Sequence, residues 1–130
     1  LAESLRNDGA QLSRQAHETA LAPRAALSAP PLAELAMLDD AAFRRRFAGT
    51  AIKRIGRDRF VRNVAYALGN GAVPTTALPA IERLLGDPSP LVRGAAVWAF
   101  SRLAPDRLAE RRRLSRESDP EVRAEWQAGA

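Results

Sequence analysis

The chain contains no cysteine and only one histidine, one lysine and one tyrosine among 130 residues. The lack of cysteine excludes disulfides, thiolate metal sites and a cysteine nucleophile. The single histidine, His17, cannot close a metal site without other donors, so we interpret it as an exposed helix residue. No apolar run approaches the roughly 20 residues of a membrane-spanning helix, and no signal-peptide pattern opens the chain. We therefore expect no membrane partner and a cytoplasmic location. Because the chain begins at Leu1 and not at methionine, we also expect a piece of a longer protein.

Patterns that carry catalysis are missing as well. Asp39 and Asp40 are explained as residues that cap a helix start and favour its dipole. No glycine-rich phosphate loop is present, since Gly69-Asn70-Gly71 is interpreted as a helix C-cap followed by a turn. No nucleophile stands in a pattern with a base. We expect this chain alone to have no enzymatic activity and to hold no cofactor or metal.

Alanine is abundant, with 27 of the 130 residues, and hydrophobic residues make up 46%. Alanine favours helices over strands, and the length suits one compact domain. We predict a boundary after residue 31. Residues 1–31 would hold a helix (Leu1–Leu21) and an extended connector (Ala22–Pro31), and residues 32–130 a helical repeat domain.

The repeat domain is predicted from three Val-Arg pairs that recur at intervals of about 30 residues, a period typical of helical repeats: Val61-Arg62, Val92-Arg93 and Val122-Arg123. Four positions before each arginine stands a favoured N-cap residue: Asp58, Ser89 or Asp119. Pro90 and Pro120 suit the first position of a helix.

Further helices are expected between these units. A short helical turn at Leu32–Met37 and a helix that starts after Asp39 and stops at Gly49 come first. Ala77–Leu85 and Arg107–Leu114 then separate the Val-Arg units. Helix pairs with this regular recurrence predict an all-α fold of HEAT-like helical repeats, a short α-solenoid, preceded by a less regular helical N-terminal segment.

The segment Phe43–Asn63 concentrates positive charge. It carries eight basic residues and one acid, a net +7, whereas the whole chain is +5. Such a patch is typical of a polyanion partner, but a solvated face, an acidic protein and an anionic lipid surface remain alternatives. Phe43, Phe47 and Phe60 could stack on bases, although their helical spacing favours a role in the core.

Individual cations in this segment have different expected roles. Gly49 and Gly56 suggest a bent connection that presents Lys53, Arg54, Arg57 and Arg59 from a helix N-terminus, where backbone amides attract phosphate. Arg62, Arg93 and Arg123 share one register of the repeat. For Arg93 and Arg123 we favour hydrogen bonds to the preceding turn or neighbouring repeat over ligand binding, and for Arg62 both remain open.

Two motifs resemble a known family. Gly49-Thr50-Ala51-Ile52-Lys53-Arg54, followed by Arg57, Phe60–Val64 and Ala67–Asn70, is one, and Ser89–Gly94 with Ala96, Trp98 and Ala99 is the other. With the lead-in Leu32–Phe47, they resemble the C-terminal region of bacterial epoxyqueuosine reductases over roughly residues 16–130. The chain departs from that family in lacking the cysteine cluster ligands, and at Ala95 and Ser101.

The resemblance implies that the full enzyme reduces epoxyqueuosine to queuosine at the wobble position of tRNA, with a cobalamin and two [4Fe–4S] clusters held by domains outside this chain. The helical repeats would dock the anticodon stem-loop. The alternative is a HEAT-like protein-interaction or structural scaffold without RNA binding. The resemblance and the basic patch together give these candidate RNA contacts: Lys53, Arg54, Arg57, Arg59, Arg62, Asn63, Asn70 and Arg93.

Overall fold

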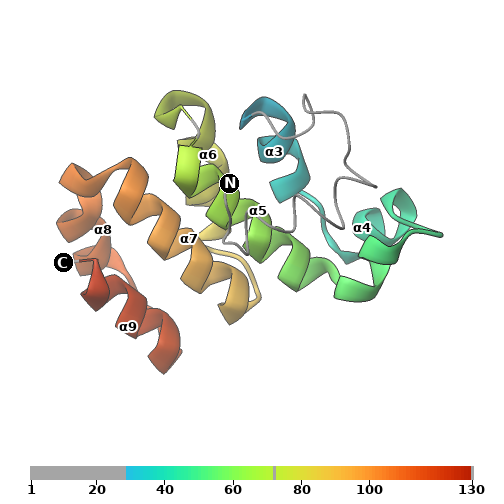
Figure 1. Cartoon of the computed structure of the whole chain (residues 1–130). Coiled ribbons are helices and arrows are strands. Elements are labelled where there is room, and N and C mark those ends of the chain that lie inside the picture. Colours follow the sequence, from blue (N-terminus) through green and yellow to red (C-terminus); the bar gives the residue numbers. More distant parts are fainter. Residues whose placement is uncertain (1–28, 72, 130) are drawn as a thin grey trace.

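The computed structural model describes residues 29–71 and 73–129, and every regular element in these ranges is a helix (Figure 1). The all-α prediction is confirmed. The expected helix Leu1–Leu21 and His17 lie outside the described residues. The α-helices are α3 (Ala29–Ala36), α4 (Asp40–Arg46), α5 (Arg57–Gly71), α6 (Pro74–Leu84), α7 (Pro90–Leu103), α8 (Leu108–Leu114) and α9 (Pro120–Ala128), and the 3₁₀ helices are η2 (Ala51–Ile55) and η3 (Pro105–Arg107).

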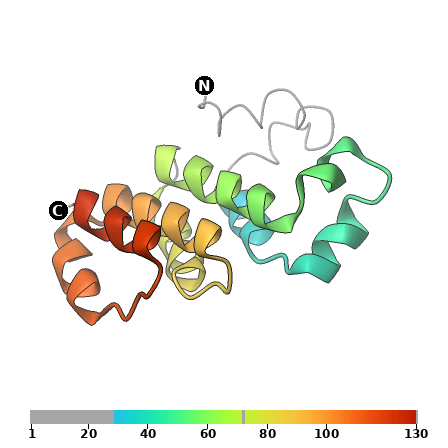
Figure 2. The same ribbon diagram turned by 90° about the horizontal axis from the view of Figure 1, so that it is seen from below.

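The long helices form stacked layers. Helices α5, α7 and α9 lie side by side, with α7 in contact with both neighbours (Figures 1 and 2). Helices α3 and α6 form a second layer, in which α3 contacts α5 and α6, and α6 contacts α7. Short connections through η3 and α8 then lead from α7 to α9. Each helix buries its apolar side against its neighbours, which is the packing of a solenoid.

Three helices begin at the capping residues that the sequence predicts. The Asp39 carboxylate accepts a hydrogen bond from the Ala42 amide at 2.8 Å, and the Ser89 hydroxyl accepts one from the Val92 amide at 3.4 Å. Asp119 caps α9 by accepting from the amides of the second and third helical residues. Asp58 was expected to be the fourth cap, and this was wrong. Helix α5 already begins at Arg57, and Asp58 lies in its first turn.

One continuous apolar core joins the layers. Val61, Val92 and Val122, the valines of the predicted repeat, have at most 2% of their surface exposed. Phe60 and Phe100 are fully buried. The repeat register predicted from the Val-Arg spacing is therefore the register in which the helices pack.

The Gly69-Asn70-Gly71 sequence is not a helix end followed by a turn, as the sequence suggested. Helix α5 continues to Gly71. A Cβ on Gly69 would lie 2.8 Å from the Trp98 ring and 2.9 Å from the Ala99 Cα. Gly69 is therefore required by the close approach of α5 and α7, and not by a left-handed backbone conformation.

Two helix starts also differ from prediction. Helix α3 begins at Ala29, three residues before the expected turn at Leu32, so the last residues of the expected connector are helical. Helix α6 begins at Pro74, not Ala77, because Pro74 at its first position needs no amide partner. This helix also accommodates Pro79 in its interior.

Candidate nucleic-acid interface

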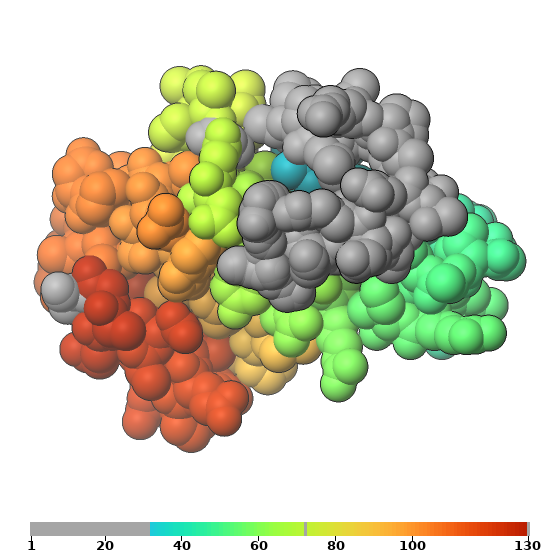
Figure 3. Space-filling model, in the orientation of Figure 1, coloured from blue at the N-terminus to red at the C-terminus, as the bar shows by residue number. Residues whose placement is uncertain are grey.

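The basic segment Phe43–Asn63 covers the end of α4, the 3₁₀ helix η2 and the first half of α5. In Figure 3, α4 and η2 lie at the opposite end of the molecule from α8 and α9. Phe43, Phe47 and Phe60 form a cluster with ring centroids 4.9–5.4 Å apart. At most 3% of the surface of each is exposed. The three phenylalanines anchor the segment to the core, as their spacing indicated, and cannot stack on a base.

Lys53 and Arg54 are exposed on η2. Their neighbour Ile52 is fully buried and fastens η2 to the core. Gly49 and Gly56 border this helix with φ angles of +77° and +87°, a backbone conformation that other residues rarely adopt. The bent connection expected from the two glycines is therefore present, and it holds the two cations on the outside of a fixed loop.

Arg57 has internal partners. Its Nη1 and Nη2 donate to the two Asp87 oxygens at 2.9 and 2.7 Å, and its Nε donates to the Leu38 carbonyl oxygen at 2.8 Å. Nη1 also donates to Asp58 at 3.0 Å. Only 13% of the Arg57 side chain and 6% of that of Asp87 are exposed. Burial alone would raise the pKa of Asp87, but hydrogen bonds from Arg57 and the Ser89 amide, with the Arg57 charge, lower it.

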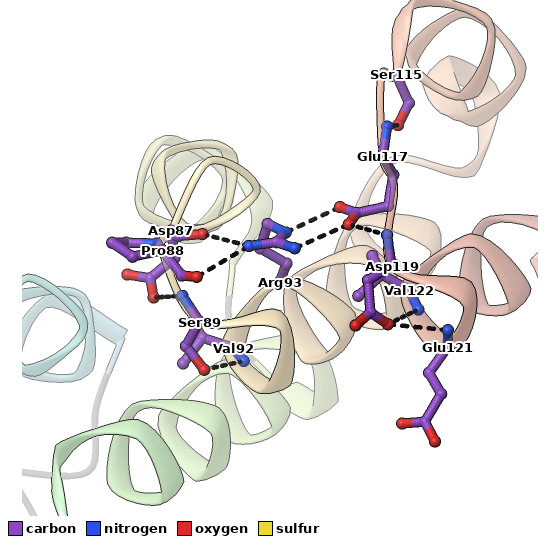
Figure 4. Close-up of polar contacts among 10 residues, drawn as sticks. All are labelled: Asp87, Pro88, Ser89, Val92, Arg93, Ser115, Glu117, Asp119, Glu121 and Val122. Carbon is purple, nitrogen blue, oxygen red and sulfur yellow. Dashed lines mark hydrogen bonds and ion pairs between the residues drawn. The ribbon is translucent and has the colours of Figure 1, made fainter.

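Arg93 has the same kind of environment (Figure 4). Its Nε and Nη2 donate to the two Glu117 oxygens, each at 2.8 Å, and its Nη1 donates to the carbonyl oxygens of Asp87 and Pro88 at 2.9 and 3.1 Å. Hydrogen bonds from Arg93 lower the pKa of Glu117 despite its burial. The structural role favoured for Arg93, bonding to the preceding turn and the next repeat, is what these contacts provide.

The remaining candidates lie on or near one stripe of α5. Arg59 and Asn70 are exposed, and Arg62 is half-buried. The Arg62 Nε and Nη2 donate to the Asn63 side-chain oxygen at 3.3 and 3.2 Å. Only 9% of the Asn63 surface is exposed, so this amide acts mainly to orient Arg62.

The same stripe includes Tyr66, which was not among the candidates predicted from the sequence. Arg59, Arg62, Tyr66 and Asn70 are spaced by three and four residues, so they share one side of α5. Trp98 and Arg102 lie four residues apart on the adjacent part of α7. The Tyr66 and Trp98 rings are 5.2 Å apart in an edge-to-face arrangement. We call this surface the α5–α7 face: Arg59, Arg62, Tyr66, Asn70, Trp98 and Arg102.

Glu125 of α9 marks the acidic border of this face. Burial raises the pKa of the Tyr66 hydroxyl, the Glu125 charge raises it further, and Arg62 acts in the opposite direction. None of the ion pairs within the described ranges involves Arg59, Arg62 or Arg102. The α5–α7 face therefore carries three positive charges beside a half-exposed aromatic pair.

Comparisons with known proteins agree with the helical architecture. Residues 59–103 match the family model of a HEAT-like repeat. A protein named epoxyqueuosine reductase from Escherichia coli (strain K12) is 39% identical over 84 residues, covering 65% of this chain and 22% of the relative. The chain is similar to part of epoxyqueuosine reductase. Its resemblance to that family, inferred from the two motifs, is confirmed.

Two further relatives carry the same name. The epoxyqueuosine reductase of Salmonella typhimurium (strain LT2) is 38% identical over 89 residues, which cover 68% of this chain and 23% of the relative. That of Pseudomonas aeruginosa (strain PAO1) is 38% identical over 80 residues, covering 62% of this chain and 22% of the relative. The chain spans between a fifth and a quarter of the length of these curated relatives. No solved structure matches it.

The HEAT-like match contains the whole α5–α7 face and excludes η2 with Lys53 and Arg54. Within residues 29–71 and 73–129, no group of three or more side chains is arranged to ligate a metal. No helix in these ranges is long and apolar enough to cross a membrane. Among the described residues, the α5–α7 face combines positive charge with two aromatic rings.

Proposed function

We propose that this chain is the tRNA-docking C-terminal region of an epoxyqueuosine reductase, which as a whole reduces epoxyqueuosine to queuosine in tRNA. One observation carries the proposal. Arg57 and Arg93 are held by buried carboxylates, whereas Lys53, Arg54 and Arg59 are exposed on elements that the core holds in place. Exposed cations on a fixed surface attract a polyanion, and no ion pair among the described residues has to be broken before they bind it.

The docking would use phosphate contacts. Lys53 and Arg54 on η2, with Arg59 and Arg62 on α5, would hold successive phosphates of the anticodon stem-loop. Such contacts fix the position of a nucleic acid and carry little sequence information. In a longer reductase, this positioning would deliver the wobble nucleotide to the catalytic domain, and the work would take place in the cytoplasm.

The cofactors of the parent belong elsewhere in this proposal. Iron–sulfur clusters are held by cysteine thiolates, and this chain has none. The residues present therefore do not fit a [4Fe–4S] cluster. We assign both clusters and the cobalamin to other parts of the longer protein, and we assign no catalytic step to this chain.

The test is a fluorescence anisotropy titration of the full chain against a labelled anticodon stem-loop at two salt concentrations. The test variant combines Lys53→Glu, Arg54→Glu and Arg59→Glu, and leaves Arg57 in place because Asp87 depends on it. About four phosphate contacts predict a log–log salt slope of roughly −2.8 to −3.6. We expect binding by the unchanged chain with such a slope, and loss of at least tenfold in affinity in the variant.

A matched control carries the same charge change elsewhere among the described residues: Arg83→Glu, Arg113→Glu and Arg116→Glu. These three arginines are exposed on α6, on α8 and just after α8. If the control loses as much affinity as the test variant, only net charge matters and the specific docking surface is refuted. An absence of binding to the stem-loop at low salt refutes RNA docking by this chain.

One observation favours the alternative, a protein-interaction role. A cleft of about 630 Å³ lies between the α6–α7 connection and α8, and apolar side chains contribute to its lining: Leu85, Val97, Leu114 and Trp126. Leu114 is 57% exposed. Exposed apolar surface of this kind suits contact with another polypeptide, such as the missing domains of the parent. Binding of those domains with little salt dependence, and no RNA binding, would favour this alternative.

A further inference from the structure

Tyr66 and Trp98 are large aromatic residues that the core does not fully enclose. Both are half-buried, on neighbouring helices of the same layer. The repeat itself does not require an aromatic residue at these positions. In the register of the Val-Arg pairs, Trp98 of α7 corresponds to Ala67 of α5 and Ala128 of α9. The aromatic pair is therefore a local addition to the α5–α7 face and not part of the repeated packing.

Arg102 lies over the Trp98 ring of this pair. Its guanidinium carbon lies 5.1 Å from the centre of the Trp98 ring, and its Nε donates a hydrogen bond to the Gly69 carbonyl oxygen at 3.2 Å. Arg102 is nevertheless exposed. The hydrogen bond and the indole restrict the rotation of the side chain, so a planar cation is fixed at the surface before any ligand arrives.

Gly69 makes this arrangement possible. A Cβ at this position would lie within 3.0 Å of the Trp98 ring and of Ala99. Only glycine lets the indole settle against the α5 backbone and leaves the Gly69 carbonyl within reach of Arg102. Gly69, Trp98 and Arg102 thus form a surface of one aromatic ring and one guanidinium that is arranged before a ligand binds.

Unpaired bases are recognised by such surfaces. Proteins that bind single-stranded RNA stack bases on aromatic rings and on arginine guanidinium planes, and place cations along the adjoining phosphates. On the α5–α7 face, Arg59 and Arg62 continue the stripe of α5 that contains Tyr66. The charges beside the aromatic pair therefore suit the phosphates on either side of a stacked base.

We propose that the α5–α7 face binds an unpaired nucleotide of the RNA, with its base stacked on the Arg102 guanidinium above the Trp98 ring and beside Tyr66. This inference rests on the proposed docking of RNA and adds a preference to it. The face would select RNA with an unstacked base, such as a loop, over a continuous duplex, in which only the two terminal base pairs expose a base face. Arg59 and Arg62 would hold the neighbouring phosphates.

The experiment uses the full chain with Trp126→Phe, so that Trp98 is the only tryptophan. The two RNA probes are a stem-loop with a seven-nucleotide loop and a blunt duplex with the same number of nucleotides. Tryptophan fluorescence and anisotropy are measured with each. We expect the stem-loop to quench Trp98 and to bind roughly tenfold more tightly than the duplex, the contribution of about one stacked base.

Variants connect the preference to the face. Arg102→Gln and Trp98→Leu are each expected to bring the ratio of the two affinities close to one, whereas Tyr66→Phe is expected to retain the preference because the ring remains. Circular dichroism identifies any variant that fails to fold. Arg102 is exposed, so Arg102→Gln keeps the test decisive if Trp98→Leu does not fold.

The outcomes separate the two proposals. Equal binding of the stem-loop and the duplex, without quenching of Trp98, overturns the stacking inference and leaves phosphate docking intact. Failure to bind either RNA overturns both. A preference for the stem-loop that survives Arg102→Gln places the selective contact elsewhere and also refutes the inference.

Discussion

Gly69 lies where α5 and α7 approach each other closely. Its carbonyl oxygen accepts a hydrogen bond from Arg102, and its missing side chain leaves room for the Trp98 ring. The backbone at Gly69 has ordinary helical geometry, so its special property is size and not conformational freedom. In a free helix, alanine would be the better residue by about 1 kcal/mol. Packing therefore favours glycine at this position, whereas helix propensity favours alanine.

The variant Gly69→Ala tests which of the two effects is larger. We expect the free energy of unfolding to fall by roughly 1–3 kcal/mol, the usual cost of overpacking a close contact. The backbone of Ala99 cannot move aside as the end of a flexible side chain can. The measurement is urea unfolding followed by circular dichroism.

The control for this substitution is Gly71→Ala, two residues further along α5. Apart from the adjacent residues and the backbone of α5 itself, no atom of the described residues would lie within 4 Å of a Cβ at Gly71. Its unfolding free energy should stay unchanged or rise slightly, since alanine is the better helix former. Equal effects of both substitutions would show that the α5–α7 contact adjusts freely and that Gly69 has no special role.

At the scale of elements, two similar carboxylate–arginine clasps join α5 to the start of α7 and α7 to the start of α9. Asp87 and Glu117 occupy the same place in successive repeats, since each lies two residues before an N-cap. Each accepts a hydrogen bond from the backbone amide of that N-cap residue, Ser89 or Asp119, at 3.0 Å. Each also accepts two hydrogen bonds from an arginine of the preceding long helix, Arg57 or Arg93. The carboxylates thus fix where α7 and α9 start. They also fix the earlier helix against which each of them packs.

The substitution Arg93→Lys tests the second clasp. Lysine keeps the charge but lacks the planar fork that reaches Glu117 and the Asp87 and Pro88 carbonyls together. We expect the unfolding free energy to fall by about 1–2 kcal/mol, as measured by urea unfolding. Arg123→Lys, at the same register but exposed, should change it by less than about 0.5 kcal/mol. A loss of RNA affinity in folded Arg93→Lys would contradict the purely structural role.

The sequence contains enough to predict most elements but not their partners. Local chemistry identified the starts of α4, α7 and α9, because Asp39, Ser89 and Asp119 bond to amides within their own helix. The spacing of the Val-Arg pairs gives Arg62 the same repeat position as Arg93. The arginine that binds the start of the next unit is nevertheless Arg57. That choice depends on Asp87, which lies in the next repeat. Of the α5–α7 face, Arg59, Arg62 and Asn70 were predicted from the sequence. Tyr66, Trp98 and Arg102 were missed because their grouping depends on contacts between α5 and α7.

At the scale of the whole molecule, the described helices share one core but differ in how many neighbouring helices stabilise them. Helix α7 lies between α5 and α9 and packs on α6, whereas α9 packs mainly on α7. The Trp126 ring of α9 lies 6.5 Å from that of Phe100, and the Arg93–Glu117 clasp fixes the connection to α9. In an array of repeats, a terminal unit has fewer neighbours and therefore less stabilisation.

Lowering the pH should reveal that α9 is less strongly stabilised than α7. The pKa values of Asp87 and Glu117 are lowered in the folded chain. Their contribution to stability is therefore complete above the unfolded pKa values of about 3.9 and 4.3, and it is lost as the pH falls through the folded values. Arg57 and Arg93 keep their charge throughout, so protonation leaves each without its ionic partner. The free energy of unfolding should decrease below about pH 4.

The two tryptophans report separate parts of the molecule. In Trp126→Phe the remaining Trp98 follows the α5–α7 contact, and in Trp98→Phe the remaining Trp126 follows α9. We expect the urea midpoints of the two fluorescence transitions to coincide at pH 7. At pH 3 the Trp126 transition should come at lower urea, because protonation of Glu117 weakens the clasp that fixes the connection to α9. Glu117→Gln, which cannot titrate, should already separate the two transitions at pH 7. Coincident transitions at both pH values, in this variant as well, would mean that the apolar core alone holds α9 in place and that the clasp adds nothing to its stability.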